Sequence, residues 1–197
     1  MIHKDEVPAC EPTRDQPGAG WIDAVLDFWF GDCDEPDWFG KDAAFDAVIR
    51  GRFMPLYRQL QSQCDLVPQS PREALAAVVV LDQFPRNMFR NEPRAYATDI
   101  QALRIARAAI ASGFDQDLPN RERLFLYLPL EHSEDLHDQE VACRLTAATG
   151  DVRWTRYAQA HQAIIERFGR FPHRNAVLGR TSTPEELAFL ETPGSAF

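Results

Sequence analysis

Residues 124–135 read LFLYLPLEHSED, and this stretch decides the fold that the sequence predicts. Seven apolar or ring-bearing residues run without a break and are followed at once by Glu131, His132, Ser133 and Glu134. A helix that is apolar on every side is typical of the core of a protein. The stretch therefore predicts a buried helix that carries ionisable groups into the protein interior or into a cleft.

Signals for the start of a helix recur on both sides of this stretch. Residues 70–73 (SPRE) place a capping hydroxyl, a first-turn proline and a capping-box glutamate before an apolar segment, residues 74–84. Ser133 is the expected cap of the helix after residues 124–131. Further helix starts are expected at Asp42, at Thr98 with Gln101, at Pro119–Asn120, at Asp151, and at Thr183 with Glu186. No segment has a convincing strand pattern, so the sequence predicts an all-α fold.

The number and packing of these helices follow from the short connections between them. Such helices pack as antiparallel pairs, and a chain of pairs forms a curved stack, so we expect about seven to nine antiparallel helices. Pro55 should bend or split the helix that begins at Asp42. The length of 197 residues suits one domain. We expect a flexible N-terminal tail over residues 1–20, which have no helical periodicity, and a single helical domain over residues 21–197.

Charge and composition exclude several classes of protein. The net charge is −9, which argues against general binding to nucleic acids or to anionic membranes, because both need an electropositive face. The longest unbroken apolar run, residues 74–81, is too short to span a bilayer. The N-terminus has no apolar signal core, and the four cysteines are scattered without CxxC spacing. We therefore expect a cytoplasmic protein with reduced thiols and with neither nucleic-acid nor membrane partners.

Six segments, in order along the chain, carry a family resemblance. They are VLDFWFG from Val25, WFGKDAAFD from Trp38, LDQFPRNMFR from Leu81, YATD from Tyr96, LFLYLPLEHSEDL from Leu124 and RFGRFPHRNAVLGR from Arg167. Together they resemble the bacterial family catalogued as domain of unknown function 924, from about Trp21 to about Glu186. The resemblance implies an irregular α-α superhelix similar to tetratricopeptide proteins. It implies no reaction, because the family has no assigned activity.

Three of these segments join an apolar helix to a polar cluster, and we expect the three clusters to meet in space. They cover residues 82–90, 131–135 and 170–180. A helix C-terminus disfavours the charge of Glu131, so an arginine is expected beside it. The candidate ligand-binding residues are Arg86, Asn87, Arg90, Arg170, Arg174, Asn175 and Arg180.

The clusters allow three functions. The first is a binding module with a polar cleft lined by Arg, His and Glu, which accepts a small anionic ligand or an acidic peptide, because guanidinium groups match carboxylate and phosphate geometry. The second is an enzyme that uses Glu131 with His132 or His173 as an acid–base pair on an anionic substrate. The third is a structural or protein-interaction domain in which the clusters are buried ion pairs that fix loop geometry.

Metal and nucleophile motifs are weak. Glu134-x-x-His137 has the spacing found in di-iron bundles, but the chain has no second copy of that motif. A mononuclear site of His132, His137 and His173 with a carboxylate is the remaining metal alternative, and it lacks tight ligand spacing. No nucleophile elbow, phosphate-binding loop or zinc-protease motif is present. The sequence therefore predicts neither a metal nor a cofactor.

Overall fold

The computed structural model describes residues 17–63 and 65–195. Within these ranges the chain forms helices and turns and no strand, which confirms the all-α prediction. The part of the predicted tail from residue 1 to 16 lies outside the described residues. None of the described helices is both long enough and apolar enough to cross a membrane.

The chain begins with short helices and one long helix. They are α1 (Trp21–Leu26), the π-helical η1 (Asp27–Asp32), α2 (Glu35–Phe39) and α3 (Ala43–Ser62). Asp42 caps α3 as predicted, since its side chain accepts hydrogen bonds from the amides of Ala44 and Phe45. Pro55 does not split α3. Burial of the apolar stripe that includes Phe53 and Tyr57 offsets the loss of one backbone hydrogen bond.

The apolar segment predicted over residues 74–84 is fully buried, but it is not one regular helix. It comprises α4 (Pro71–Val78), capped by Ser70, and the π-helical turn η2 (Val79–Gln83), and it enters α5 (Phe84–Met88). π-helical turns inserted in α-helices are frequent at functional sites. Here the wide turn carries Asp82.

The middle of the chain corrects one predicted capping box. After η3 (Pro93–Tyr96), α6 (Asp99–Ala111) begins at Thr98, but the Thr98 side chain donates its hydrogen bond to the carbonyl of Leu81 at 2.5 Å instead of capping α6. Gln101 reaches the carbonyls of Leu60 and residue 63. Both side chains therefore join α6 to earlier elements. Backbone carbonyls of those elements compete with the start of α6 for the hydrogen bonds of these side chains.

The C-terminal part comprises four further helices and two 3-10 turns. They are η4 (Phe114–Asp117), α7 (Asn120–Glu131), α8 (Leu136–Ala148), α9 (Val152–Phe168), η5 (Pro172–Arg174) and α10 (Pro184–Leu190). The predicted capping box of Thr183 with Glu186 is present, and Asp151 caps α9. Ser133 does not cap α8. Asp135 does so by accepting the amide of Asp138, and the Ser133 hydroxyl donates to the Asp138 carboxylate at 2.6 Å.

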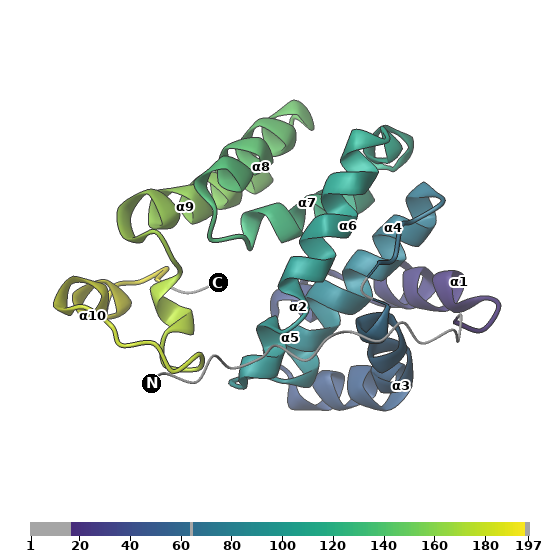
Figure 1. Ribbon diagram of the computed structural model, residues 1–197, viewed down its shortest axis with the longest axis horizontal. Helices are drawn as coiled ribbons and strands as arrows, with labels where there is room; N and C mark the ends of the chain where they lie inside the picture. The colour runs from purple at the N-terminus through teal and green to yellow at the C-terminus, as the bar shows by residue number, and fades with distance from the viewer. Residues whose placement is uncertain (1–16, 64, 196–197) are drawn as a thin grey trace, which may run out of the picture.

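Helix α7, the stretch that decides the predicted fold, is central. It is buried from Leu124 to Glu131 and packs against α4, α6, α8 and α9 (Figure 1). In Figure 1 helices α1 to α6 lie on one side of α7, and α8, α9 and α10 lie on the other. The polar end of α7 is therefore at the junction between the two sides.

Candidate functional site

Asp82 is the centre of a buried polar network. It has no exposed surface, and its carboxylate contacts His132 Nδ1 at 2.8 Å, Gln83 Nε2 at 2.5 Å and a guanidinium nitrogen of Arg86 at 3.2 Å. Burial raises the pKa of Asp82, but Arg86 and His132 lower it by more, so the pKa lies well below its usual range. Asp82 is therefore an anion at neutral pH, and the π-helical turn places it between α7 and α5.

Arg86 and Arg174 share Asp99. Arg86 binds the Asp99 carboxylate through two hydrogen bonds of 2.9 and 3.0 Å and also donates to the backbone carbonyl of Asp82. Arg174 also contacts the Asp99 carboxylate, but at a longer distance of 3.5 Å. Its guanidinium lies 4.8 Å from the Tyr96 ring centroid and 4.4 Å from that of Phe171. Asp99, the first residue of α6, thus joins the two arginines.

The contacts close into a circuit. The Phe171 and His161 ring centroids are 5.8 Å apart, and those of His161 and His132 are 6.1 Å apart. We call this circuit the contact ring. Its members, in order, are Asp82, Arg86, Asp99, Arg174, Phe171, His161 and His132. They come from η2, α5, α6, η5, the turn before η5, α9 and the end of α7, so the ring spans the junction seen in Figure 1.

The histidines of this region are held neutral. Burial, followed by Arg86, lowers the pKa of His132. Burial, followed by His132, lowers the pKa of His161 to about 3, and burial with repulsion from Arg174 lowers that of His173 to about 4. His161 donates its Nδ1 proton to the Tyr157 carbonyl at 2.8 Å. The ring therefore holds two carboxylates, two guanidinium ions and neutral imidazoles at pH 7.

Glu131 differs from the prediction, because none of the described arginines forms an ion pair with it. Among the described residues neither of its buried carboxyl oxygens has a hydrogen-bond partner, and Nδ1 of the neutral His161 lies 3.8 Å from one of them. Burial, with the charge of Asp82, raises the pKa of Glu131 to about 8. Glu131 is thus mostly protonated at neutral pH, since the retained proton neutralises the carboxyl group in place of an ion pair.

The predicted ligand-binding residues divide between three places. Arg86 and Arg174 are in the contact ring. Asn87 and Arg90 instead bind Asp46 of α3, and Arg90 also donates to the carbonyl of Gly40.

The remaining candidates lie around η5 and α10. Arg170 pairs with Glu186 at 2.6 and 2.8 Å, and Arg180 pairs with Glu134 at 2.7 and 3.0 Å. Asn175 donates to the Ser182 hydroxyl. These contacts fix the chain after α9 onto the start of α8 and onto α10. Nε lacks a hydrogen-bond partner among the described residues in both Arg174 and Arg180. Arg174 is the less completely paired of the two, because its contact with a carboxylate is 3.5 Å long, whereas Arg180 binds Glu134 at 2.7 and 3.0 Å.

Sequence reasoning did not select Asp82, Asp99 or His161 as site residues. Asp82 has a readable signal, because it is the first charge at the end of an apolar run. His161 also has one, since it shares a helical stripe with Ile164 and Ile165, which are both buried. Asp99 has no such signal, because an acidic residue in the first turn of a helix is ordinary.

The residues of the two metal alternatives do not form a metal-binding cluster among the described residues. Within residues 17–63 and 65–195 no group of three or more His, Cys, Asp and Glu side chains is placed to hold a metal ion. Glu134 accepts the amide of Phe171 and both nitrogens of Arg180, while the His137 side chain is 78% exposed. The two residues of the Glu-x-x-His pattern therefore have separate surroundings.

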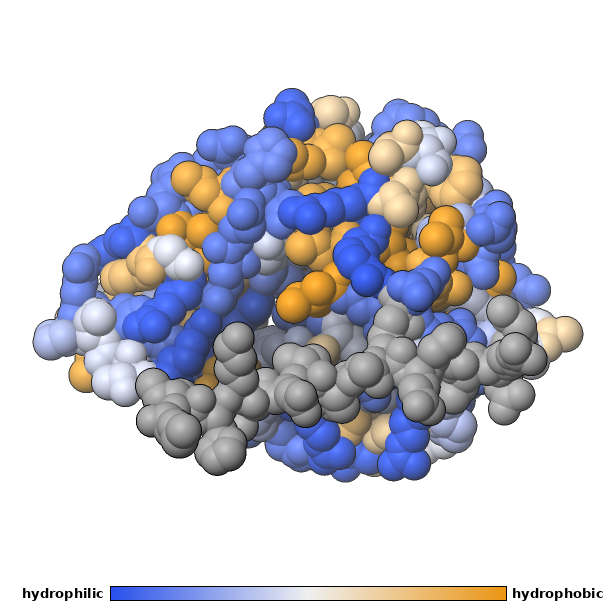
Figure 2. Space-filling model, viewed as in Figure 1, coloured by the Kyte–Doolittle hydropathy of each residue, from blue (hydrophilic) through white to orange (hydrophobic). Residues whose placement is uncertain are grey.

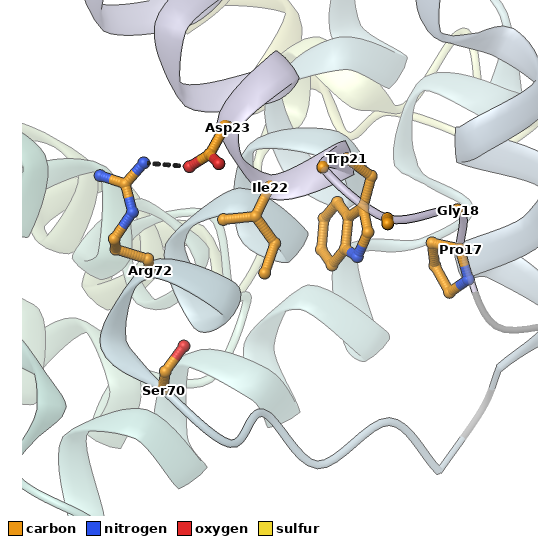
Figure 3. Close-up of a pocket in the computed structure, with 9 residues that line it drawn as sticks. Pro17, Gly18, Trp21, Ile22, Asp23, Ser70 and Arg72 are labelled. Carbon is orange, nitrogen blue, oxygen red and sulfur yellow. Dashed lines mark hydrogen bonds and ion pairs between the residues drawn. The ribbon is translucent and has the colours of Figure 1, made fainter.

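The surface of the molecule has two hollows. Figure 2 shows a hollow on the viewed face, between the side formed by α8, α9 and α10 and the rest of the molecule. A separate hollow of about 390 Å³ lies between the start of α1 and the start of α4, where Arg72 pairs with Asp23 at 2.7 Å (Figure 3). The second hollow contains none of the ring residues.

An all-helical protein with a buried ring of arginine, aspartate and histidine is thus the class that the structure defines. The chain belongs to the family described as "Bacterial protein of unknown function (DUF924)", whose model matches residues 25–194. It is similar to the solved structure of a protein of unknown function, ATU0120, from Agrobacterium tumefaciens. The identity is 40% and the TM-score 0.79, over 88% of this chain and 98% of that chain. No curated protein matches the chain.

Proposed function

We propose that the protein binds a small anionic ligand at Arg174. The observation that carries this proposal is the state of its guanidinium group. Arg174 is only 6% exposed, its one ion-pair contact is 3.5 Å long, and its Nε has no hydrogen-bond partner within the described residues. A buried cation with unused donors is costly, and an anion that accepts those donors removes the cost.

The aromatic rings around Arg174 support this assignment. Tyr96 and Phe171 hold the guanidinium group in a fixed plane, and a planar fork of donors suits a carboxylate or a phosphate. Solvent reaches this side of the ring, because the side chains of Arg86 and Asp99 keep 21% and 17% of their exposure. The restricted access favours a small ion over an acidic peptide.

Electrostatics support a monovalent or divalent small ion as the ligand. Arg86 pairs with Asp82 and has the shorter contact with Asp99, so Arg174 has only a share of one carboxylate. The lowered pKa of Arg174, caused by burial and by repulsion from Arg86, reports a cation with insufficient neighbouring negative charge. An added anion would supply that charge.

The proposal also includes the location, the domain organisation and the helix stacking expected from the sequence. The protein functions in the cytoplasm as a single helical domain over residues 21–197, and its antiparallel helix pairs stack as in tetratricopeptide-like superhelices. In that arrangement the ring occupies a junction between helix pairs, which is where helical folds commonly place ligands.

Titration calorimetry with inorganic phosphate, acetate and succinate tests the proposal. Arg174→Gln should weaken binding about ten- to a hundredfold, because a hydrogen bond to a charged group contributes about 1.5–3 kcal/mol. Arg170→Gln is the matched control, since Arg170 lies four residues away and is paired with Glu186. The proposal fails if none of the three anions binds, or if Arg174→Gln binds as tightly as the wild type.

A further inference from the structure

Binding of an anion at Arg174 does not explain the hydrogen-bonded pair of Asp82 and His132. The Asp82 carboxylate accepts the Nδ1 proton of His132 at 2.8 Å, and Gln83 and Arg86 hold the same carboxylate in place. A buried carboxylate on one imidazole nitrogen fixes the tautomer of the ring and stabilises the imidazolium ion that forms when the other nitrogen takes up a proton. This arrangement is typical of a general base.

We propose that His132 is a general base, oriented by Asp82, which removes a proton from a small carboxylate held at Arg174. The inference rests on the anion-binding function proposed above and assigns a reaction to the same site. In this proposal His132 is the catalytic residue, because it takes the proton directly from the ligand. Asp82 is a positioning residue that acts through His132.

The protonation state of His132 suits this role. Asp82 is ionised, so the shared proton resides on His132 Nδ1 and the Nε2 lone pair is free of that proton. Burial and Arg86 keep the imidazole neutral at pH 7. Its side chain keeps 13% of its exposure, so the ring is not sealed from solvent.

The contacts of His132 favour a carbon acid as the substrate. Its hydrogen-bond partner in the described part of the chain is Asp82, so His132 forms no hydrogen bond there with a hydroxyl or thiol that could serve as a nucleophile. The base therefore acts directly on the ligand. A C–H bond next to a carbonyl group is the acidic position that a small oxo-carboxylate offers.

The proton transfer balances without another reactant. The C–H bond breaks, an N–H bond forms at His132 Nε2, and the electron pair moves to the carbonyl oxygen as an enolate. The resulting imidazolium ion is paired with Asp82, and the enolate charge develops in the field of Arg174 and Arg86. Return of a proton from solvent-exchanged imidazolium regenerates the ligand.

Exchange of ligand protons with solvent deuterium measures this step. The full chain is incubated in D₂O with pyruvate, 2-oxobutyrate or 2-oxoglutarate, and loss of the C–H signal next to the carbonyl group is followed by proton NMR. The wild type should accelerate exchange of at least one of them, and His132→Gln should lower that rate about 10²- to 10⁴-fold, the usual contribution of a general base. His137→Gln is the matched control, since His137 is exposed beyond the start of α8, and it should exchange at the wild-type rate.

The wild-type pH profile and Asp82→Asn provide readouts that a structural role would not change. As the pH increases, the exchange rate should rise while the His132 imidazolium loses its proton. The rate should reach its plateau before the pH reaches 6.5, because the pKa of His132 is lowered. The groups that face it are Asp82 of η2, Arg86 of α5, Asp99 of α6, His161 of α9 and His173 of η5, with Glu131 on its own helix. Asp82→Asn should lower the rate and shift the rise of the profile.

The outcomes separate the two proposals. If phosphate or succinate binds in an Arg174-dependent manner but none of the three oxo-carboxylates exchanges faster than in buffer, the general base is refuted and the binding function stands. Exchange that persists in folded His132→Gln, as shown by circular dichroism, also refutes it. If no anion binds, both proposals fail. Acceleration lost in His132→Gln, kept in His137→Gln and restored by added imidazole supports the inference.

Discussion

The aromatic core of the N-terminal part and the contact ring solve the same packing problem in different ways. Phe28, Trp29, Phe53 and Phe84 pack with centroid distances from 4.6 to 6.3 Å and are at most 5% exposed. The contact ring instead holds two guanidinium groups, two carboxylates and neutral imidazoles, of which Arg86 and Asp99 stay partly exposed. The first region gains its stability from apolar area, which is non-directional, whereas the second depends on specific partners.

This difference separates stability from function. In the aromatic core the buried group without a hydrogen-bond partner among the described residues is the neutral Nε1 of Trp29. In and beside the contact ring such groups are ionisable, namely Nε of Arg174 and the carboxyl oxygens of Glu131. The apolar cluster beside the ring is small, and consists of Ile164, Ile165 and Phe171 with Phe168 and Phe189 against it. The apolar packing beside the contact ring therefore contributes less stability than the aromatic core does. Sites commonly retain such local costs, which the rest of the fold offsets.

The largest expected effect is in the aromatic core. Phe84 has no exposed surface and contacts Phe28, Trp29 and Phe53, so Phe84→Ala leaves a cavity among three rings. We expect the free energy of unfolding to fall by about 3–5 kcal/mol, measured by urea denaturation. Phe84→Leu should lose clearly less. A loss below about 1 kcal/mol for Phe84→Ala would show that this core does not dominate stability.

The next effect is a pH dependence that arises from Glu131, which lies beside the contact ring. Glu131 has a pKa raised from 4.5 to about 8 in the folded chain, so the folded state holds a proton that the unfolded state releases. Its stabilising contribution is complete below pH 4.5 and is lost as the pH rises through 8. Each pH unit in this window lowers the free energy of unfolding by about 1.4 kcal/mol.

The neighbouring histidines act in the opposite direction. The pKa values of His161 and His173 are lowered from 6.5 to about 3 and about 4, so their contribution is present above pH 6.5 and is lost as the pH falls. Between pH 6.5 and 8 the histidines are neutral in both the folded and the unfolded chain, so of these three groups only Glu131 changes the free energy of unfolding. Glu131→Gln should remove a decline of about 2 kcal/mol over this interval.

Urea denaturation at several pH values measures this slope, with Glu140→Gln as the control. The Glu140 side chain is 55% exposed on α8, so this control should keep the wild-type slope. Equal slopes in the wild type and in Glu131→Gln would mean that Glu131 is ionised and paired in the folded chain.

The same contrast explains how far the sequence predicts the fold. Caps and apolar runs are local signals, and they correctly predicted an all-α chain, the start of α3 at Asp42 and a buried helix from Leu124. The cap at Ser133 was wrong by two residues, because Ser133 and Asp135 are both good caps and only the packing of Asp138 decides between them.

Prediction of the site was limited by the choice of partners. Arg86 and Arg90 are four residues apart and would share one face of a continuous helix, but α5 ends at Met88 and Arg90 turns towards Asp46. Asp99, which joins Arg86 to Arg174, lies outside the three polar clusters. Partner choice between distant charges depends on tertiary packing, which local pattern does not encode.

The smallest expected effect concerns an ion pair on the surface. Arg72 and Asp23 pair at 2.7 Å beside the hollow of Figure 3, with side chains 52% and 68% exposed. Water screens this pair, so Arg72→Gln should change the free energy of unfolding by less than about 0.5 kcal/mol, and 1 M salt should remove the difference. Arg72→Lys, which keeps the charge, should match the wild type. A loss above about 1 kcal/mol would mean that α1 depends on this charge pair to dock against α4, and the N-terminal part would then share the ring's dependence on specific partners.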